Sequence, residues 1–298
     1  MKSDVYERIT GTIITALEQG VRPWHQPWAV GHLAGPVSRP LRGNGQPYSG
    51  INIIMLWATA TEKGFSAPIW MTFKQAKELG AHVRKGEKGA LVVYAGAIQR
   101  TETNDNGEDE ERNIPFLKGY TVFNVEQIEG LPAHFTATHP QHLNEEERNA
   151  AADAFFTASG ADIRHGGNRA YYAPGPDYVQ MPEFGAFRDA GAYYATLAHE
   201  CTHWTKHETR LDRDLGRKKW GDSGYAMEEL VAELSAAFLC ADLGLTPEPR
   251  EEHAAYIANW LEVLKGDKRA IFHAASHAQK AADYLHSLQH PLEEEAAA

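Results

Sequence analysis

Two histidines four residues apart, with a glutamate beside the first, are the residues of this chain best placed to do chemistry. Residues 199–203 read His-Glu-Cys-Thr-His. On a helix, residues four apart share a face, so His199 and His203 can direct both imidazoles at one metal ion. Glu200 then stands beside the site, within reach of a metal-bound water. The spacing predicts metal-assisted hydrolysis of an amide bond with Glu200 as the general base.

A catalytic metal ion needs a third protein ligand and one open position. Residues 226–243 have the pattern of a helix on which Glu229 and Glu233 lie four residues apart among alanines. Carboxylates on a close-packed face need a cation or hydrogen-bond donors. We therefore predict Glu229 as the third ligand and Glu233 as the acceptor that orients a histidine through its other ring nitrogen. Glu228 points about 100° away on the helix and is the weaker candidate.

Other reactive side chains near this motif fit the site less well. His207 continues the histidine spacing, but its Cα would lie about 12 Å along a straight helix from that of His199. Cys201 lies about 200° around the helix from His199 and is expected in the core. Tyr194 and Tyr225 are candidates for an oxyanion-stabilising hydroxyl, although ordinary packing explains either one. We expect one divalent ion, Zn²⁺ first and Mn²⁺ as the alternative.

Composition excludes several classes of protein. The chain has 298 residues, 43% of them hydrophobic, which suffices for a substantial core. Its apolar stretches fall short of the roughly 20 residues of a membrane span, so no membrane partner is expected. With two cysteines and no signal-peptide pattern, the cytoplasm is the expected compartment. The net charge of -11 argues against a protein that coats nucleic acid, but the first 130 residues carry as many basic as acidic side chains.

The elements that must position the chemistry are predicted from periodicity and turn residues. Asp4 and Thr72 are expected to cap helices, the second over 73–79, and residues 51–63 form another. Strand-like segments at 89–97 and 120–124 bracket an insertion at 100–115 with an acidic turn. The predicted elements farther on are helices at 145–159, 191–209, 226–243, 251–264 and 268–288, with short strands at 170–173 and 178–181.

Gly130, Pro132 and Pro140, in a stretch with little periodicity, mark the expected domain boundary. We predict an α+β protein of two domains. Residues 1–130 form an α+β domain, residues 131–143 a linker, and residues 144–298 a mainly helical domain with a small sheet that carries the metal site.

Residues 39–88 combine cations with interleaved aromatics, which suits single-stranded DNA because phosphates attract charge and exposed bases stack on rings. Core packing explains many of the rings equally, and residues 83–89 also read as a solvated basic turn. The aromatics are Tyr48, Trp57, Phe65, Trp70 and Phe73. The candidates for contact with DNA are Arg39, Arg42, Tyr48, Asn52, Lys74, Arg84, Lys85 and Lys88.

Four segments of the first part have specific sequences. They read Tyr-Ser-Gly-Ile-Asn at 48–52, Trp-Met-Thr-Phe-Lys-Gln-Ala at 70–76, Val-Arg-Lys-Gly-Glu-Lys-Gly at 83–89 and Val-Phe-Asn-Val-Glu-Gln at 122–127. They resemble the N-terminal single-stranded-DNA-binding domain of ArdC-type antirestriction proteins, a domain that also begins some plasmid primases. The second part, with residues 199–203 and the helix around 228–239, resembles the zincin-like metallopeptidase domain of the same family.

The resemblance covers nearly the whole chain. It implies a plasmid-encoded protein that binds single-stranded DNA and protects incoming DNA from type I and other restriction systems during conjugation. If the peptidase site acts, a host restriction-system protein or another host protein is the implied substrate. Two alternatives stay open: a DNA-binding protein whose metal site is structural or vestigial, and a nuclease or replication-accessory protein. The lack of a clustered two-metal carboxylate motif counts against nuclease action.

Overall fold

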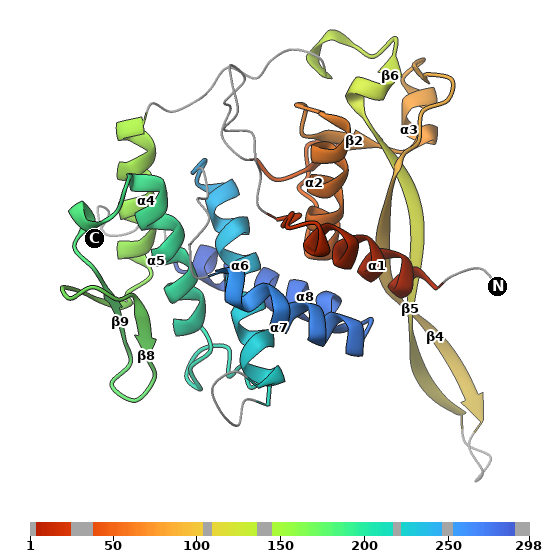
Figure 1. Ribbon diagram of the computed structural model, residues 1–298. Coiled ribbons are helices and arrows are strands. Elements are labelled where there is room, and N and C mark those ends of the chain that lie inside the picture. Colours follow the sequence, from red (N-terminus) through yellow and green to blue (C-terminus); the bar gives the residue numbers. More distant parts are fainter. Residues whose placement is uncertain are drawn as a thin grey trace, which may run out of the picture.

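The structure is a computed structural model that describes residues 4–24, 38–103, 109–135, 145–216, 222–245 and 253–289. Its first part contains a four-stranded sheet in the order β1-β2-β5-β4 and a two-stranded sheet of β3 and β6. Helices α1 and α2 lie between the long strands and the rest of the molecule (Figure 1). The elements of this part are α1 (Val5–Glu18), β1 (Leu41–Arg42), α2 (Ile51–Lys63), β2 (Ile69–Met71), α3 (Phe73–Glu78), β3 (His82–Val83), β4 (Ala90–Thr103), β5 (Asp109–Asn124), η1 (Val125–Gln127), β6 (Ile128–Glu129) and η2 (Ala133–Phe135).

The predicted helix starts of this part are confirmed. The Asp4 side chain accepts a hydrogen bond from the backbone N–H of Tyr6 at the start of α1. Thr72 and Gln75 form a reciprocal capping box at the start of α3, in which each side chain bonds the other's backbone N–H. Both caps satisfy N–H groups that have no partner inside the helix.

The insertion predicted at 100–115 is wrong as a separate feature. Strands β4 and β5 continue through it as one antiparallel hairpin, paired in register from Ala90↔Val122 to Thr103↔Asp109. The β-branched residues Thr101, Thr103 and Ile114 favour strand in this stretch. The tip, residues 104–108, lies outside the described residues, so the predicted acidic turn stays a prediction.

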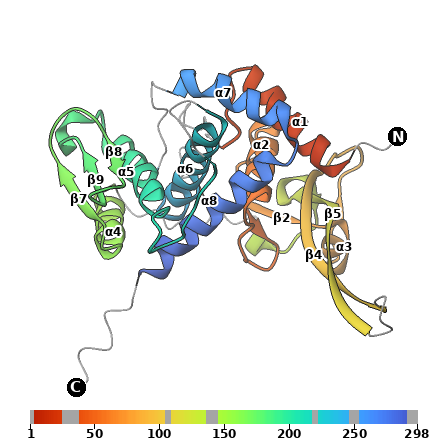
Figure 2. The ribbon, with the colours of Figure 1, turned by 90° about the horizontal axis from the view of Figure 1, so that it is seen from below.

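The second part is mainly helical and carries a three-stranded sheet in the order β7-β9-β8. Helix α5 packs between this sheet and α6, and α8 packs across α6 (Figure 2). The predicted strands and the helix after residue 144 are confirmed; β7 was not predicted. The elements are α4 (Glu145–Ala158), β7 (Asp162–His165), β8 (Tyr171–Ala173), β9 (Tyr178–Met181), η3 (Phe184–Ala186), α5 (Ala190–Trp204), α6 (Ser223–Asp242), α7 (His253–Gly266) and α8 (Ala270–Ser287).

Helix α5 ends five residues before the predicted bound at 209. The Thr205 hydroxyl donates a hydrogen bond to the backbone carbonyl of Thr202, and the side chain of Arg213 donates to the same carbonyl. Side chains that take up helical carbonyls in this way end a helix. The chain then turns back, which brings Arg213 to the inside of the molecule, 8% exposed.

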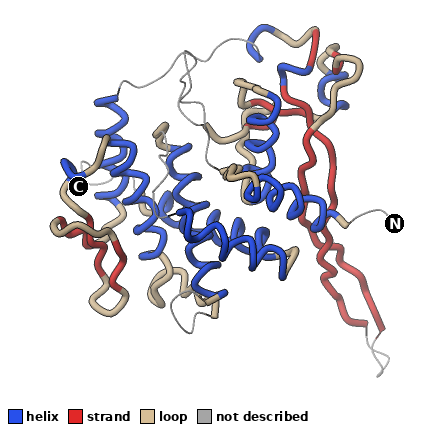
Figure 3. The backbone as a smooth tube through the Cα atoms, in the orientation of Figure 1, coloured by secondary structure: helices blue, strands red, loops and turns tan. Residues whose placement is uncertain are grey.

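The two parts share one hydrophobic core. Ile9 of α1, Trp57 of α2 and Phe238 of α6 belong to the same buried cluster, and α1 packs along α7. The Thr10 hydroxyl donates a 2.7 Å hydrogen bond to the backbone carbonyl of Lys268 across this junction. Strands therefore lie at both sides of a continuous helical centre (Figure 3).

The predicted linker at 131–143 is only partly described. Its first residues form η2, where Phe135 is 8% exposed and packs in a second cluster with Ile69 and Met71. Residues 131–135 thus belong to the packed first part, whereas residues 136–143 lie outside the described residues. None of the described helices is both long and apolar enough to cross a bilayer.

Candidate metal centre and nucleic-acid interface

Two neighbouring helices build the candidate metal centre. Asp189 caps α5 by accepting a 2.8 Å hydrogen bond from the backbone N–H of Ala192, and Asp222 caps α6 in the same way at Tyr225. Small residues such as Ala232 and Ala236 of α6 allow the two helices to pack closely. His199 and His203 are 5% and 7% exposed, so the site is nearly closed from solvent.

The side chains of three residues converge between these helices. Nε2 of His199 lies 3.2 Å from Nε2 of His203; the first is 3.5 Å from Oε2 of Glu229 and the second is 3.5 Å from Oε1 of Glu229. A tetrahedral ion with bonds of about 2.0–2.1 Å separates its ligand atoms by about 3.3–3.4 Å. In the described part of the chain, these three residues form the one group of candidate ligands within 4.8 Å of one another. The geometry fits a divalent ion with one position open and favours Glu229 as the third ligand.

Glu228 orients His203. The Nδ1 atom of His203 lies 3.0 Å from a carboxylate oxygen of Glu228, which can only accept, so Nδ1 keeps its proton and Nε2 is the nitrogen that would give up its proton to bind a metal ion. Arg213 holds Glu228 in turn with two hydrogen bonds of 2.9 and 2.8 Å. The sequence identified neither this function of Glu228 nor the contribution of Arg213, which lies far along the chain from the motif.

The structure places Glu233 beside Nδ1 of His199, the ring nitrogen that its predicted orienting function concerns, and that function stays a prediction. The nearer oxygen of Glu233 is 3.8 Å from Nδ1 of His199, longer than a hydrogen bond. Its other oxygen forms an ion pair of 3.4 Å with Arg22, which follows α1 in the first part. Glu233 is therefore a carboxylate beside the site that also ties the two parts of the molecule together.

The charges of the site are strongly coupled. Burial lowers the pKa of His203, but the carboxylates of Glu229 and Glu228 outweigh burial and raise it to about 9. Burial raises the pKa of Glu228, but Arg213 and His203 lower it to about 2. The pKa of Glu229 is likewise held well below its usual range by the two histidines, against the effect of burial. The carboxylates stay ionised, which suits a site for a dication.

Other candidate residues of the motif are also placed. Glu200 is 5% exposed on the ligand-bearing helix. The Tyr225 hydroxyl lies 3.0 Å from that of Tyr256, and burial, the bond to Tyr256 and the charge of Glu229 raise the pKa of Tyr225. Tyr194 instead donates to the backbone carbonyl of Asn149, as packing predicts. Cys201 is fully buried, and burial raises its thiol pKa, so the predicted core position is confirmed.

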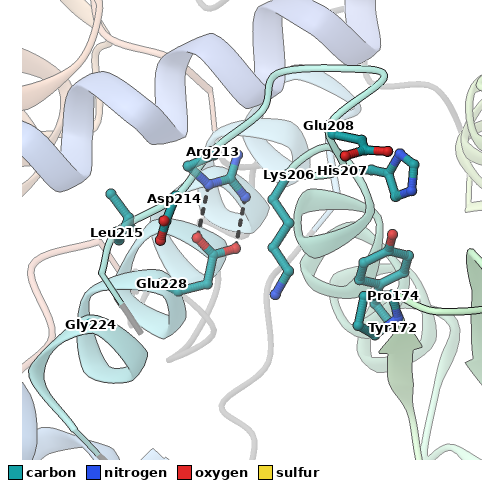
Figure 4. A pocket seen from close by; sticks show the side chains of 10 residues that line it. All are labelled: Tyr172, Pro174, Lys206, His207, Glu208, Arg213, Asp214, Leu215, Gly224 and Glu228. Atoms are coloured by element: carbon teal, nitrogen blue, oxygen red, sulfur yellow. Dashed lines mark hydrogen bonds and ion pairs between the residues drawn. The ribbon is translucent and has the colours of Figure 1, made fainter. Parts of the chain in front are cut away.

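A cavity of about 320 Å³ opens beside the orienting residues. Glu228 and Arg213 form one wall, and Tyr172 of β8 and His207 lie on the other (Figure 4). The side chain of Lys206 extends between the two walls. The cavity is large enough for one amino-acid side chain and lies on the side of the site that faces the small sheet.

Three of the residues predicted to contact DNA instead make contacts inside the protein or lie in its core. Arg39 forms an ion pair of 2.6 Å with Asp242 of α6 and is 11% exposed at its side chain. Tyr48 is 3% exposed in the core. Asn52 exchanges two hydrogen bonds with the backbone of Val93. Contact of Arg39, Tyr48 or Asn52 with DNA stays a prediction, and it would require Arg39 and Asn52 to exchange these partners and Tyr48 to leave the core.

The remaining basic candidates lie on the surface. Arg42, Lys85 and Lys88 are exposed, and the Lys74 side chain is 86% exposed. Arg84 is exposed and pairs with Glu87 at 2.7 Å, which fixes the basic turn before β4.

Most aromatics of this region are buried, as their core interpretation predicts. Trp57 and Trp70 are 2% and 1% exposed, whereas Phe73, next to Lys74, is 57% exposed. The hairpin carries a further exposed ring, Tyr94, that sequence reasoning missed because it lies beyond the basic region.

Comparison with known proteins decides the family. Residues 3–123 match the model of the N-terminal domain of anti-restriction factor ArdC, and residues 150–277 match that of a zincin-like metallopeptidase. The chain is also similar to the antirestriction ArdC protein from plasmid R388. The metal-free crystal structure of that protein matches this chain with a TM-score of 0.80 and 49% sequence identity. The match covers 96% of this chain and 98% of the other. The chain belongs to the ArdC antirestriction family.

The Mn(II)-bound crystal structure of R388 ArdC matches at 47% identity with a TM-score of 0.78, over 96% of this chain and 98% of that one.

Members and relatives of the ArdC family differ in length. An uncharacterized protein, y4eC, of Sinorhizobium fredii is 47% identical over 96% of this chain and 93% of its own length. The DNA primase TraC of Escherichia coli is 38% identical over 96% of this chain but only 27% of the primase. The α+β architecture in two parts, expected from the sequence, is confirmed.

Proposed function

We propose that this ArdC-family protein binds single-stranded DNA through its first part and hydrolyses a peptide bond at a divalent metal ion in its second part. Both activities would serve the protection of incoming plasmid DNA against restriction. The observation that carries the peptidase proposal is the 3.2–3.5 Å spacing of Nε2 of His199, Nε2 of His203 and the Glu229 oxygens. Three protein ligands with an open fourth position favour a catalytic over a purely structural site.

The chain's own residues supply the other parts of the mechanism. A bound divalent ion would lower the pKa of a coordinated water and polarise a peptide carbonyl. Glu200, buried on the same helix, would accept a proton from the attacking water and return it to the departing amine. Glu228 keeps the proton of His203 on Nδ1 and thereby keeps Nε2 available as a ligand. Tyr225, close to Glu229, is the candidate donor to the oxyanion that develops on the carbonyl.

Glu200→Gln tests the peptidase proposal. The amide keeps the size of the side chain but cannot act as a base, so we expect metal affinity within about two-fold of the wild type and loss of protection in a conjugation assay into a restricting host. Glu262→Gln, at an exposed position of α7, is the matched control. Full protection by Glu200→Gln would show that peptide hydrolysis is dispensable and would favour the binding-protein alternative.

The DNA proposal rests on the exposed cations Arg84, Lys85 and Lys88. We expect affinity for single strands to fall steeply with salt, and the triple change to glutamine to reduce the slope of log K against log salt by about 2. Fluorescence anisotropy with a labelled oligonucleotide measures both. The matched control replaces the exposed cations Arg164, Arg169 and Arg188 of the second part by glutamine. If both triple variants lose the same affinity, only net charge is involved and this binding surface is wrong.

A further inference from the structure

We propose that one face of the outer β4–β5 hairpin is a second contact surface for single-stranded DNA, where bases stack against Tyr94 and Phe116. The proposal rests on the DNA binding proposed above and extends it to a part of the chain outside the basic turn. The hairpin projects away from the helical centre in two perpendicular views (Figures 1 and 2).

The hairpin changes character along its length. Its inner rungs are core: Val92 and Val122 are both fully buried. Farther out, Tyr94 and Ile98 are each 58% exposed and Ile114 is 38% exposed. Soluble proteins rarely expose contiguous apolar side chains unless they bind something.

These side chains share one face. Tyr94 pairs with Lys118, Gly96 with Phe116, and Ile98 with Ile114, and alternate rungs of a ribbon point to the same side. The rungs from Tyr94 to Ile98 span about 14 Å. They form a continuous strip, called the outer strip below, that consists of Tyr94, Gly96, Ile98, Ile114, Phe116 and Lys118.

The glycine in the centre shapes the outer strip. A Cβ atom on Gly96 would lie 2.8 Å from Cζ of Phe116 and 3.0 Å from Cε1 of Tyr94, so the two rings occupy the space that a side chain would need. The ring centroids are 6.0 Å apart with an angle of 54° between the planes. Phe116 is thus held over the strand, while the adjoining Tyr94 offers most of its surface to a ligand.

The charge beside the outer strip favours nucleic acid over an apolar protein surface. Lys118 is exposed beside Tyr94. Lys118 therefore places a cation beside an aromatic and aliphatic strip, the combination by which proteins bind phosphates and stack bases.

The outer strip also continues from the proposed DNA-binding turn. Lys88 precedes the first residue of β4, Ala90, by two positions, so the basic turn and the hairpin are one continuous segment. A single strand bound at the turn would meet the hairpin next. The outer strip should therefore add affinity only to oligonucleotides long enough to reach it.

The test compares a strip variant with a control on the opposite face of the same ribbon. Tyr94→Ala with Ile98→Ala removes the two most exposed apolar side chains, and exposure makes both changes compatible with folding. Gln99→Ala with Asn113→Ala alters an exposed cross-strand pair on the other face. Anisotropy is measured with a 30-nucleotide oligo(dT), with an 8-nucleotide one, and with a 30-nucleotide strand of abasic sites. Circular dichroism verifies folding.

We expect the strip variant to bind the 30-nucleotide strand about ten-fold more weakly than the wild type, as loss of base stacking predicts, with the control unchanged. Its affinity for the abasic and the short strands should equal that of the wild type. Unchanged affinity for the long strand overturns the proposal, and so does conversion of a wild-type dimer to a monomer without loss of DNA affinity. If the wild type binds none of the strands, the proposed DNA function is wrong as well. If the triple glutamine variant of Arg84, Lys85 and Lys88 loses affinity and the strip variant does not, only the proposal for the outer strip is wrong.

Discussion

Glu228 and Glu229 are neighbours in the sequence and meet opposite nitrogens of the same imidazole. Glu228 holds Nδ1 of His203, while Glu229 lies 3.5 Å from Nε2. The sequence predicted that His199, His203 and Glu229 lie together, because helical periodicity is local, and the structure brings them together; ligation by Glu229 stays a prediction. The sequence could not predict which carboxylate orients which histidine ring. That depends on how two helices pack and on Arg213, which reaches the site from a turn.

Glu229→Ala should weaken Mn²⁺ and Zn²⁺ binding by more than the 10- to 100-fold that is typical when an orienting carboxylate is lost. The reason is that the change removes one of three ligand atoms. Isothermal titration calorimetry measures the affinity, with Glu262→Ala as a control. If Glu233→Ala has the larger effect, Glu233 is the ligand and the assignment is wrong.

At the scale of elements, hydrophobic periodicity and turn residues predicted the bounds of most helices within a few residues. They did not predict that strands β4 and β5 continue as one long hairpin. The acids around 102–111 read as a solvated turn, yet they are spread over two paired strands. Charge alone does not stop a strand when cross-strand pairing satisfies the backbone. The sequence also left open how the β8–β9 turn is anchored beside α5.

Asp177 ties the β8–β9 turn to the segment after α5, and its contribution to stability should depend on pH. Hydrogen bonds from Arg210 and Tyr172, opposed by burial, lower its pKa. A carboxyl with a lowered folded pKa stabilises the protein above its unfolded pKa of about 3.9 and loses that contribution as pH falls through the folded value.

Asp177→Asn removes the charge and tolerates the left-handed backbone at this position, where φ is 51°. We expect the melting temperature of the wild type to exceed that of the variant by a constant difference from pH 7 to pH 5. This difference in melting temperature should shrink below about pH 4. Thermal melts followed by circular dichroism measure it, and a margin that widens on acidification would contradict the assignment of charge to this turn.

At the scale of the whole molecule, burial separates residues that the sequence treats alike. Arg39 and Arg42 look equivalent in the sequence as basic loop residues. In the structure, Arg39 forms an ion pair with Asp242 and is largely buried, whereas Arg42 is exposed. The Tyr48 ring belongs to the core and the Phe73 ring does not. Such differences arise from contacts between distant segments, so local pattern cannot supply them.

The shared core predicts one cooperative unfolding transition for the entire chain. Ile9, Trp57 and Phe238 lose their contacts together if either part opens. Differential scanning calorimetry should show a single peak with calorimetric and van't Hoff enthalpies in agreement. Mn²⁺ at about 100 times its dissociation constant should stabilise the whole molecule by about 2.7 kcal/mol. Two peaks, of which metal shifts only one, would show that the parts unfold independently.

The contact of Arg22 with Glu233 makes the first part a neighbour of the candidate metal ligands. A chimaera that joined the second part to a foreign partner would leave a carboxylate beside His199 without this guanidinium and would strip helices α7 and α8 of their cover. Engineering or recombination of this protein therefore has to transfer both parts as one inherited block.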